Sequence, residues 1–465
     1  MSVATTRQFD ALETALGARE LIEYCYAQGW TDGLPVVPPV QAIVDEFLAQ
    51  TPRDPDEVLM VQPHLDRVCT VRHAAINAVM AGCRPEYFPV LLAALDAFEA
   101  GGSPRTNLMQ STTGQAEIII VNGPIRGELG FNSTGNIFGP GDRANATLGR
   151  ALRLIIMNAL GIRPHEFDQS TQGTSAKYTC CIAENEEDSP WEPLHVERGF
   201  PRQASTVTVQ MVRGDLYVEH RSSQVPEEIL ATIADSMTAA GLITQVTEKV
   251  SPLGGVVVIG PEHAQLIARR GWSKQDVKQY LFEHAGKTKR ELRRFGKLHA
   301  AIEQEADDAF IRSLVSASAI MVVVAGANNA GVSTICPSIT TSREIGFNGT
   351  RAIVRLCTQS GHPEPEFFAP PGGFGVRLPS ARPLGPVAPG LAVTPRQQDI
   401  LNLLAGSPRL PLQRGVPLML ARALAHAGQY GASRLPLQRD VRLRHGGCVR
   451  RRSARARGRS VTPSR

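Results

Sequence analysis

Residues 130–150 carry the residue types that bind a polar or anionic small molecule. The segment contains five glycines, three asparagines and two arginines, follows a short apolar run and leads into a stretch with helical spacing. Glycine lets backbone N–H groups approach a ligand closely, and a helix N-terminus offers unpaired donors and a partial positive charge. We therefore expect a ligand cradle in which the Arg143 guanidinium binds a carboxylate or phosphate. Four further polar side chains are expected to orient the ligand: Asn132, Ser133, Asn136 and Asn145.

A second interpretation of this segment is purely structural. Asparagine and glycine are also the residues that take left-handed backbone conformations in turns. The segment has neither the Gly-Lys-Ser/Thr of a Walker A loop nor a clean GxGxxG pattern, so it does not predict a nucleotide site. The sequence leaves the cofactor unknown.

Glu184 is the first candidate for proton transfer. It follows a strand-like stretch at residues 178–183, and a carboxylate at the end of a buried strand can act as a general base; Glu186 is the alternative. Cys181 could act as a nucleophile if a nearby cation stabilised its thiolate. The other interpretation is a pair of buried cysteines followed by a solvated acidic loop.

His195 and Glu197 are the second candidates for catalysis. In an extended segment, side chains two residues apart face the same side, which would pair an imidazole with a carboxylate. Such a pair suits acid–base catalysis, and a structural hydrogen bond between the two side chains is the alternative. A metal centre needs further ligands, and the sequence has neither a His-x-x-x-His nor a Cys-x-x-Cys pattern, so no metal is expected.

Three runs of β-branched and other apolar residues, each closed by glycine, predict buried strands: 118–121, 256–259 and 321–324. Such runs are typical of partly parallel strands covered on both faces, and helical spacing at 148–160 predicts a flanking helix. The fold class expected is therefore α/β with mixed sheets. Because ligands bind at the carboxyl ends of parallel strands, we expect Asn122, just after the first run, to bind substrate as well. Residues 206–212 and 216–219 predict a β-hairpin around an Arg-Gly-Asp turn.

Composition divides the chain into four parts. We expect a mainly helical N-terminal region, an α/β domain with the Asn/Gly-rich loop, a second α/β domain and a Pro/Arg-rich tail, at residues 1–110, 111–245, 246–345 and 346–465. After residue 380 the chain has sixteen arginines, no lysine and two aspartates. This composition indicates either a disordered basic arm or an aberrant segment translated from GC-rich DNA in the wrong frame.

The charge distribution argues against a nucleic-acid partner of the folded body. The net charge of the chain is +5, but the residues after 380 carry about +14, which leaves about −9 for the rest. No apolar run approaches the roughly 18 residues of a membrane span, and no secretory signal is visible, so we expect a cytoplasmic protein without membrane contact. The eight cysteines lack ligand-like spacing and fit reduced thiols. Oligomer formation is left open.

Several strings together resemble a family of uncharacterised bacterial proteins. They are WTDGLPVVPP at residues 30–39, VNGPI at 121–125 and WEPLHVERGF at 191–200, with shorter strings between them. The resemblance covers roughly residues 15–340. Members look like companions of small UGSC-motif thiol or selenol proteins, so the resemblance implies a thiol or selenol partner protein, because this chain has no Cys-Gly-Ser-Cys of its own.

Together these features predict an enzyme or enzyme subunit that acts on a small polar or anionic organic molecule. The alternative is a non-catalytic ligand-binding or scaffold subunit. The two differ in one structural requirement. An enzyme of this kind needs an acid–base pair within hydrogen-bond reach of the bound substrate, whereas a scaffold does not.

Overall fold

The computed structural model describes residues 17–100, 109–242, 253–314, 316–339, 349–356, 366–368 and 375–377. The chain divides into two compact units, residues 1–360 and 361–465. In the second unit the described residues form one antiparallel strand pair, β13 (Glu366–Phe368) with β14 (Gly375–Arg377). The Arg-rich stretch after residue 380 lies outside the described residues. All elements below belong to the first unit.

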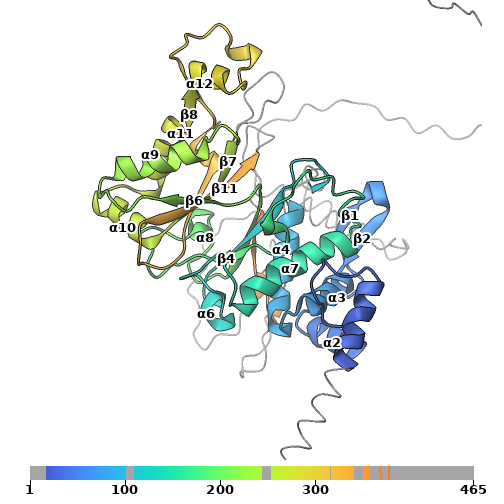
Figure 1. Cartoon of the computed structure of the whole chain (residues 1–465). Helices are drawn as coiled ribbons and strands as arrows, with labels where there is room; N and C mark the ends of the chain where they lie inside the picture. The colour runs from blue at the N-terminus through green and yellow to red at the C-terminus, as the bar shows by residue number, and fades with distance from the viewer. Residues whose placement is uncertain are drawn as a thin grey trace, which may run out of the picture. The chain divides into compact units, whose positions relative to one another are not determined.

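Helices and one short strand pair make up the N-terminal part (Figure 1). The elements are α2 (Gln41–Leu48), β1 (Val58–Gln62), β2 (Arg67–Thr70), α3 (Val71–Ala81) and α4 (Phe88–Ala100). Helix α3 begins at a capping box in which Thr70 and His73 exchange side-chain to backbone hydrogen bonds. It ends at Gly82, whose φ of 84° is the left-handed conformation that glycine adopts at little cost.

Two four-stranded mixed sheets form the centre of the fold. The first sheet has the order β12-β5-β3-β4, with β3 and β4 parallel and the other pairs antiparallel. Its strands are β3 (Ala116–Asn122), β4 (Cys181–Ala183), β5 (Thr206–Val212) and β12 (Gly349–Ala352). The second sheet has the order β10-β7-β11-β6, with β7 and β10 parallel. Its strands are β6 (Leu216–Glu219), β7 (Leu253–Ile259), β10 (Ile320–Val324) and β11 (Val332–Ile339).

Further helices connect or cover these strands, which confirms the predicted α/β class. They are α6 (Ile125–Leu129), α7 (Arg143–Asn158), α8 (Leu194–Glu197), α9 (Pro226–Met237), α10 (Pro261–Arg269), α11 (Lys274–His284) and α12 (Lys289–Arg294). A short antiparallel pair, β8 (Gly286–Thr288) with β9 (Phe310–Arg312), adjoins α12. Figure 1 shows α9, α10 and α11 around the strands of the second sheet.

The two sheets pack face to face, and helices cover their outer faces. Along β3, Ile118 belongs to the core between the sheets, and the next residue, Ile119, belongs to the core under α3, α4 and α7. Along β7 the same alternation places Val256 between the sheets and Val257 under α9, α10 and α11. The described part of the first unit is therefore built in four layers, helices, sheet, sheet and helices.

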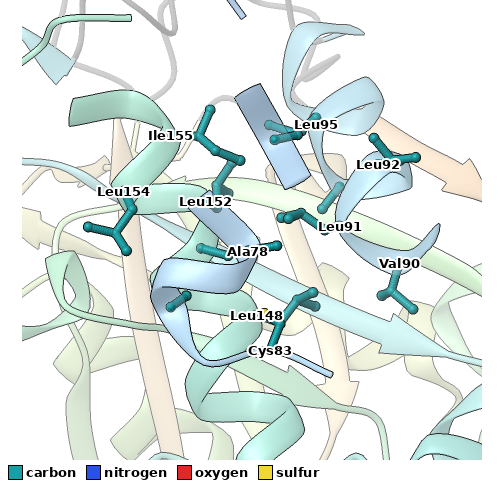
Figure 2. Close-up of a cluster of buried hydrophobic side chains, with 14 of the residues drawn as sticks. Ala78, Cys83, Val90, Leu91, Leu92, Leu95, Leu148, Leu152, Leu154 and Ile155 are labelled. Carbon is teal, nitrogen blue, oxygen red and sulfur yellow. The ribbon is translucent and has the colours of Figure 1, made fainter. Parts of the chain in front are cut away.

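The core under the first sheet joins three helices through small and branched side chains. Figure 2 shows how they meet: Ala78 of α3, Leu91 and Leu95 of α4, and Leu152 and Ile155 of α7. All five are at most 1% exposed. Alanine at the centre lets the helices approach closely, and the leucines fill the space between them. Truncating one such leucine to alanine typically costs about 2–5 kcal/mol.

The two sheets repeat one pattern of strand pairing. In both sheets, residues that lie opposite each other on neighbouring strands follow the same register, so that β3, β4, β5 and β12 correspond to β7, β10, β11 and β6. Three pairs of the first sheet match three of the second: Val121↔Ala183 matches Ile259↔Val324, Val121↔Val207 matches Ile259↔Ser333, and Val209↔Gly349 matches Ile335↔Leu216. The helices correspond as well, because α4 packs on β5 and β12 as α9 packs on β11 and β6, and α7 contacts β4 as α11 contacts β10. The unit thus contains two equivalent repeats, α4-β3-α6-α7-β4-β5-β6 and α9-β7-α10-α11-β10-β11-β12.

The last strand of each repeat lies in the sheet of the other repeat. Strand β6 follows β5 in the chain but pairs with β11, and β12 follows β11 but pairs with β5. The predicted hairpin of residues 206–219 is therefore wrong, although both strands form at the predicted positions. The physical reason is that β3 and β12 occupy both edges of β5, so β6 crosses to the second sheet. Strand β12 lies within the predicted tail at 346–465, but it pairs with β5 of the predicted α/β domain at 111–245.

Replacement of Gly349 by alanine tests the exchanged strand β12. A Cβ at this position would overlap the carbonyl group of Ala97 in α4, which is backbone and cannot rotate away. We expect Gly349→Ala to lower the free energy of unfolding by about 2 kcal/mol or more, measured by denaturant titration. Gly127→Ala in α6 is the matched control, because its Cβ would meet no atom within 4 Å, and its stability should be unchanged or slightly higher. Equal effects of the two substitutions would contradict the packing of α4 on β12.

Candidate functional site

Polar side chains meet at the carboxyl ends of the parallel strands β3 and β4. The Asn122 carboxamide donates from Nδ2 to Glu184 Oε2 at 2.6 Å and to Glu186 Oε1 at 3.1 Å. The Gly123 amide donates to the same Glu186 oxygen at 2.7 Å. Asn122 and Glu184 are fully buried. Two residues selected from the sequence, Asn122 and Glu184, are therefore in direct contact.

Arg126 of α6 balances the negative charge of this cluster. Its Nη1 donates to the Glu184 carbonyl at 2.7 Å, and its Nε lies 3.2 Å from Glu186 Oε1. Its two Nη atoms each donate to one Glu187 oxygen at 3.0 Å, a bidentate pair. This hydrogen bonding from Arg126 lowers the pKa of Glu187. The guanidinium thus contacts the backbone of Glu184 and the carboxylates of Glu186 and Glu187.

Helix α8 brings an imidazole and a backbone amide to the same cluster. The Leu194 amide donates to Glu184 Oε2 at 2.7 Å. His195 is fully buried, with Nδ1 3.8 Å from Glu186 Oε1 and Nε2 3.2 Å from the Arg202 carbonyl oxygen. A carbonyl oxygen only accepts hydrogen bonds, so Nε2 is the nitrogen that donates to it. In a neutral imidazole, Nδ1 is then the nitrogen that can accept a proton.

Glu197 does not face the same side as His195, because residues 194–197 are helical rather than extended. Side chains two residues apart on a helix point about 200° away from each other. Glu197 instead meets two lysines of α11. Lys278 Nζ donates a hydrogen bond to Glu197 Oε1, and Lys274 Nζ lies 3.4 Å from Oε2. The geometry assumed from the sequence for the His195–Glu197 pair is therefore wrong.

Lys274 and Lys278 reach the cluster from one side of α11, one turn apart. Lys274 Nζ lies 3.8 Å from Glu184 Oε1. Burial lowers the pKa of Lys278, against the opposing effect of its hydrogen bond with Glu197. Burial also lowers the pKa of Arg198 to about 10. Lys274 therefore lies next to the buried Glu184 carboxylate, while Lys278 and Arg198 are two further cations beside Glu197.

Four buried polar atoms at this place have no hydrogen-bond partner among the described residues: Asn122 Oδ1, Glu184 Oε1, His195 Nδ1 and Thr206 Oγ1. Asn122 and Thr206 lie opposite each other in the β3–β5 register, so their side chains are neighbours on one face of the sheet. Leaving one such group unpaired costs about 1–3 kcal/mol, and folded proteins normally satisfy it with a protein group, a water molecule or a ligand. Four together are the feature expected of a site for a polar molecule.

The Asn/Gly-rich loop packs on β4 and uses its amides internally. Asn145 Oδ1 accepts from the Asn132 amide at 2.8 Å, and Asn145 Nδ2 donates to the Cys181 carbonyl at 3.0 Å. The Asn132 side chain in turn accepts from the Thr134 amide at 2.9 Å. These two predicted substrate-binding side chains therefore hold the loop against the strand.

Asn136 and Ser133 hold the remainder of the same loop. Asn136 has a left-handed backbone with φ of 59°, and its Nδ2 donates to the Pro140 carbonyl at 2.8 Å. The Ser133 carbonyl accepts from the Gly326 amide at 3.0 Å, just after β10. The loop thus lies at the strand ends as expected. The left-handed backbone of Asn136 is the conformation that the structural interpretation of the loop predicts for asparagine.

Arg143 contacts helix α3 rather than the carboxylate cluster. Its Nε donates to the Gly82 carbonyl at 2.9 Å, and its Nη2 donates to the Cys83 carbonyl at 3.4 Å. Carbonyls at the end of a helix lack intrahelical donors and carry partial negative charge, so the guanidinium stabilises this end of α3. The cations that reach the cluster come from α6 and α11.

The neighbouring cysteines are protonated thiols. Burial raises the pKa of Cys180 to about 12 and that of Cys181 well above its ordinary value. A thiol is a poor nucleophile compared with a thiolate, which disfavours the nucleophilic role considered for Cys181. In the part of the chain that the structure describes, no group of three or more His, Cys, Asp or Glu side chains is arranged to hold a metal ion.

Comparison with known proteins adds no assignment, because no family model, curated protein or solved structure matches this chain. The resemblance to an uncharacterised bacterial family therefore stays a prediction. Among the helices of the described ranges, none has the length and apolar character needed to span a bilayer.

The lysines of α11 are the site residues that the sequence analysis missed. They lie far along the chain from Glu184, in the second repeat. A local signal for them does exist. Lys274 and Lys278 are four residues apart and share a helix face with the buried residues Val277 and Leu281. Lysine is rarely buried without a partner, so two lysines on an apolar helix face indicate a buried acidic site.

The ion pair of Glu197 predicts a change of stability with pH. Burial alone would raise the pKa of Glu197, but the hydrogen bond and charge of Lys278 and the charge of Lys274 outweigh it, so the pKa is lowered. A carboxylate with a lowered pKa stabilises the folded state above its ordinary value of 4.5, and this contribution is lost as the pH falls through the folded pKa. We expect the midpoint of thermal unfolding to fall more steeply below pH 4.5 in the wild type than in Glu197→Gln.

Glu46→Gln is the control for this experiment. Glu46 is exposed on α2 and forms no ion pair with another described residue. Its variant should follow the wild-type curve. Parallel curves for all three proteins would contradict the pairing of Glu197 with the lysines.

Proposed function

We propose that this chain is a cytosolic enzyme or enzyme subunit that acts on a small polar or anionic organic molecule by acid–base catalysis. The active site would be the cluster at the ends of β3 and β4. One observation carries the proposal. Glu184 Oε1 is a fully buried carboxylate oxygen without a hydrogen bond to any described residue, and it lies 3.8 Å from the Lys274 ammonium group.

Glu184 is the proposed general base. Its other oxygen, Oε2, accepts from Asn122 Nδ2 at 2.6 Å and from the Leu194 amide at 2.7 Å. These two donors fix the plane of the carboxylate, so Oε1 has a defined direction toward a bound molecule. Such preorganisation supports proton abstraction, because the base does not have to be reoriented during the reaction.

His195 is the proposed second proton-transfer group. A proton accepted at Nδ1 would produce an imidazolium 3.8 Å from the Glu186 carboxylate. That carboxylate is held by the Gly123 amide and by Arg126. The negative charge would stabilise the protonated ring, which supports a role of His195 as the acid or base complementary to Glu184.

The cations of α8 and α11 support an anionic substrate. Side-chain exposure rises from 0% at Glu184 to 10% at Lys274 and 32% at Glu197, so the network reaches the surface through Glu197. An anionic group of the substrate would compete with Glu197 for Lys278 and Arg198. Lysine ammonium and arginine guanidinium groups both bind carboxylates and phosphates well.

A thiol or selenol partner protein belongs to this proposal through the family resemblance alone. The second candidate function is a non-catalytic ligand-binding or scaffold subunit. The complete burial of Glu184 and His195 favours it, because a buried network of this kind can also be a purely structural polar core.

Turnover of the Glu184→Gln variant is the decisive test. The substitution keeps the shape of the side chain but removes the base, so we expect turnover to fall about 100-fold or more while binding is retained. Purified protein is incubated with a mixture of small hydroxy acids, keto acids and phosphate esters, and substrate loss is followed by mass spectrometry. Arg143→Gln is the matched control, because its contacts are with α3, and it should keep its turnover.

Circular dichroism and thermal unfolding establish that each variant is folded. If Glu184→Gln does not fold, Lys274→Met provides the same test, because it removes the cation beside the proposed base. Full turnover in the folded variants would overturn the acid–base assignment. Binding without turnover in the wild type, unchanged by either substitution, would favour the ligand-binding alternative.

A further inference from the structure

A cavity of about 920 Å³ lies near the amino end of β3 and is separate from the carboxylate cluster. Its walls are the turn at residues 29–32, helix α7 and residues 163–178. Arg153 lines it and donates to Glu117 at the start of β3 at 3.1 Å. Glu117 and Asn122 are five residues apart along the strand, which corresponds to about 17 Å. The volume is in the range of sites for small organic molecules.

One wall of the cavity is held rigidly by side chains of α7. The Asp32 carboxylate accepts from Arg150 Nε at 2.8 Å and from Arg150 Nη2 at 2.7 Å. The Trp30 carbonyl accepts from Asn158 Nδ2 at 2.9 Å. Trp30 and Asp32 belong to the WTDGLPVVPP string, which has no part in the proposed function. These contacts fix the part of the string that lines the cavity, Thr31 and Asp32.

Arg163 is a cation on this wall without a carboxylate partner among the described residues. Its Nη1 donates to the Gly29 carbonyl at 2.6 Å, and its Nη2 donates to Asn158 Oδ1 at 3.1 Å. Both partners are neutral. The charge of Arg163 therefore remains to be balanced at the cavity.

Arg153 is the second cation that faces the cavity, and it is 4% exposed. Its Nη2 lies 3.6 Å from Asp168 Oδ2, an oxygen that also accepts from Lys177 Nζ at 2.5 Å. Its Nε is buried and has no hydrogen-bond partner in the described ranges. Two carboxylates, Glu117 and Asp168, thus serve the two cations Arg153 and Lys177, and one guanidinium donor of Arg153 is left for a ligand.

We infer that this cavity binds a small organic carboxylate, and that Arg163 and Arg153 recognise its anionic group. Guanidinium groups match the planar geometry of a carboxylate. Arg163 provides a cation without a carboxylate partner among the described residues, and Arg153 provides an unused buried donor. Tyr26 and Tyr178 line the same cavity and supply aromatic surface for the body of the ligand. The volume is far larger than an inorganic anion requires, which favours an organic ligand.

The test uses three carboxylates with their neutral amides: benzoate, 4-hydroxybenzoate and 3-phenylpropionate. Dissociation constants are measured by ligand-observed NMR on the full chain. We expect at least one carboxylate to bind and its amide to bind at least about tenfold more weakly, because the amide lacks the charge. Gln172→Glu, at the exposed rim, should weaken carboxylate binding about tenfold by repulsion and leave the weak binding of the amide unchanged. Arg163→Gln should abolish the preference for the carboxylate.

Lys278→Met is the control, because it removes a cation from the other cluster and should leave binding of the carboxylate within about twofold of the wild type. If Arg163→Gln disturbs the fold through its contact with Gly29, Gln172→Glu still tests the site, since that substitution removes no described contact. Three outcomes would overturn the inference: no carboxylate binds, the amides bind equally well, or binding depends on Lys278 and not on Gln172.

Discussion

Neither sheet of this protein is complete without a strand from the other repeat. Without β12, strand β5 would have an open edge, and without β6 the same would hold for β11. An open edge leaves a row of unpaired backbone groups, so each repeat depends on the other for its hydrogen bonds. The core between the sheets adds to this dependence, since Ile118 and Val256 lie in one cluster. The exchange explains why the described repeats belong to a single compact unit.

The backbone is repeated, but the chemistry is not. The strand registers place Asn122, Glu184 and Thr206 in correspondence with three residues of the second repeat: Gly260, Ala325 and Val332. The second repeat therefore lacks the carboxylate, the amide and the hydroxyl at these places. It contributes instead the lysines of α11, which reach the acidic cluster of the first repeat. A buried carboxylate requires a nearby cation to remain charged at acceptable cost, so the cluster needs both repeats.

Local sequence rules predicted the α/β class and part of the site. Continuous apolar runs predicted the buried strands β3, β7 and β10, and their positions just after strand-like stretches selected Asn122 and Glu184, which are in contact. The rules did not predict the strand exchange, because hairpin propensity is local and the occupation of both edges of β5 is a tertiary effect. They also assigned an anion-binding role to Arg143. The composition of the loop could not reveal that the Arg143 guanidinium donates to two carbonyls at the end of α3. The lysines were missed because the pairing partner lies in the other repeat.

Cleavage of the chain between the repeats tests the central claim most directly. A protease site is inserted between Ser222 and Ser223, in the turn between β6 and α9, where Ser222 is exposed. After cleavage, native mass spectrometry measures whether the two fragments remain together. Interlocked repeats predict a one-to-one complex with the circular dichroism of the intact chain, because each fragment still holds a strand of the other's sheet. Fragments that separate under native conditions and are each folded on their own would contradict the account.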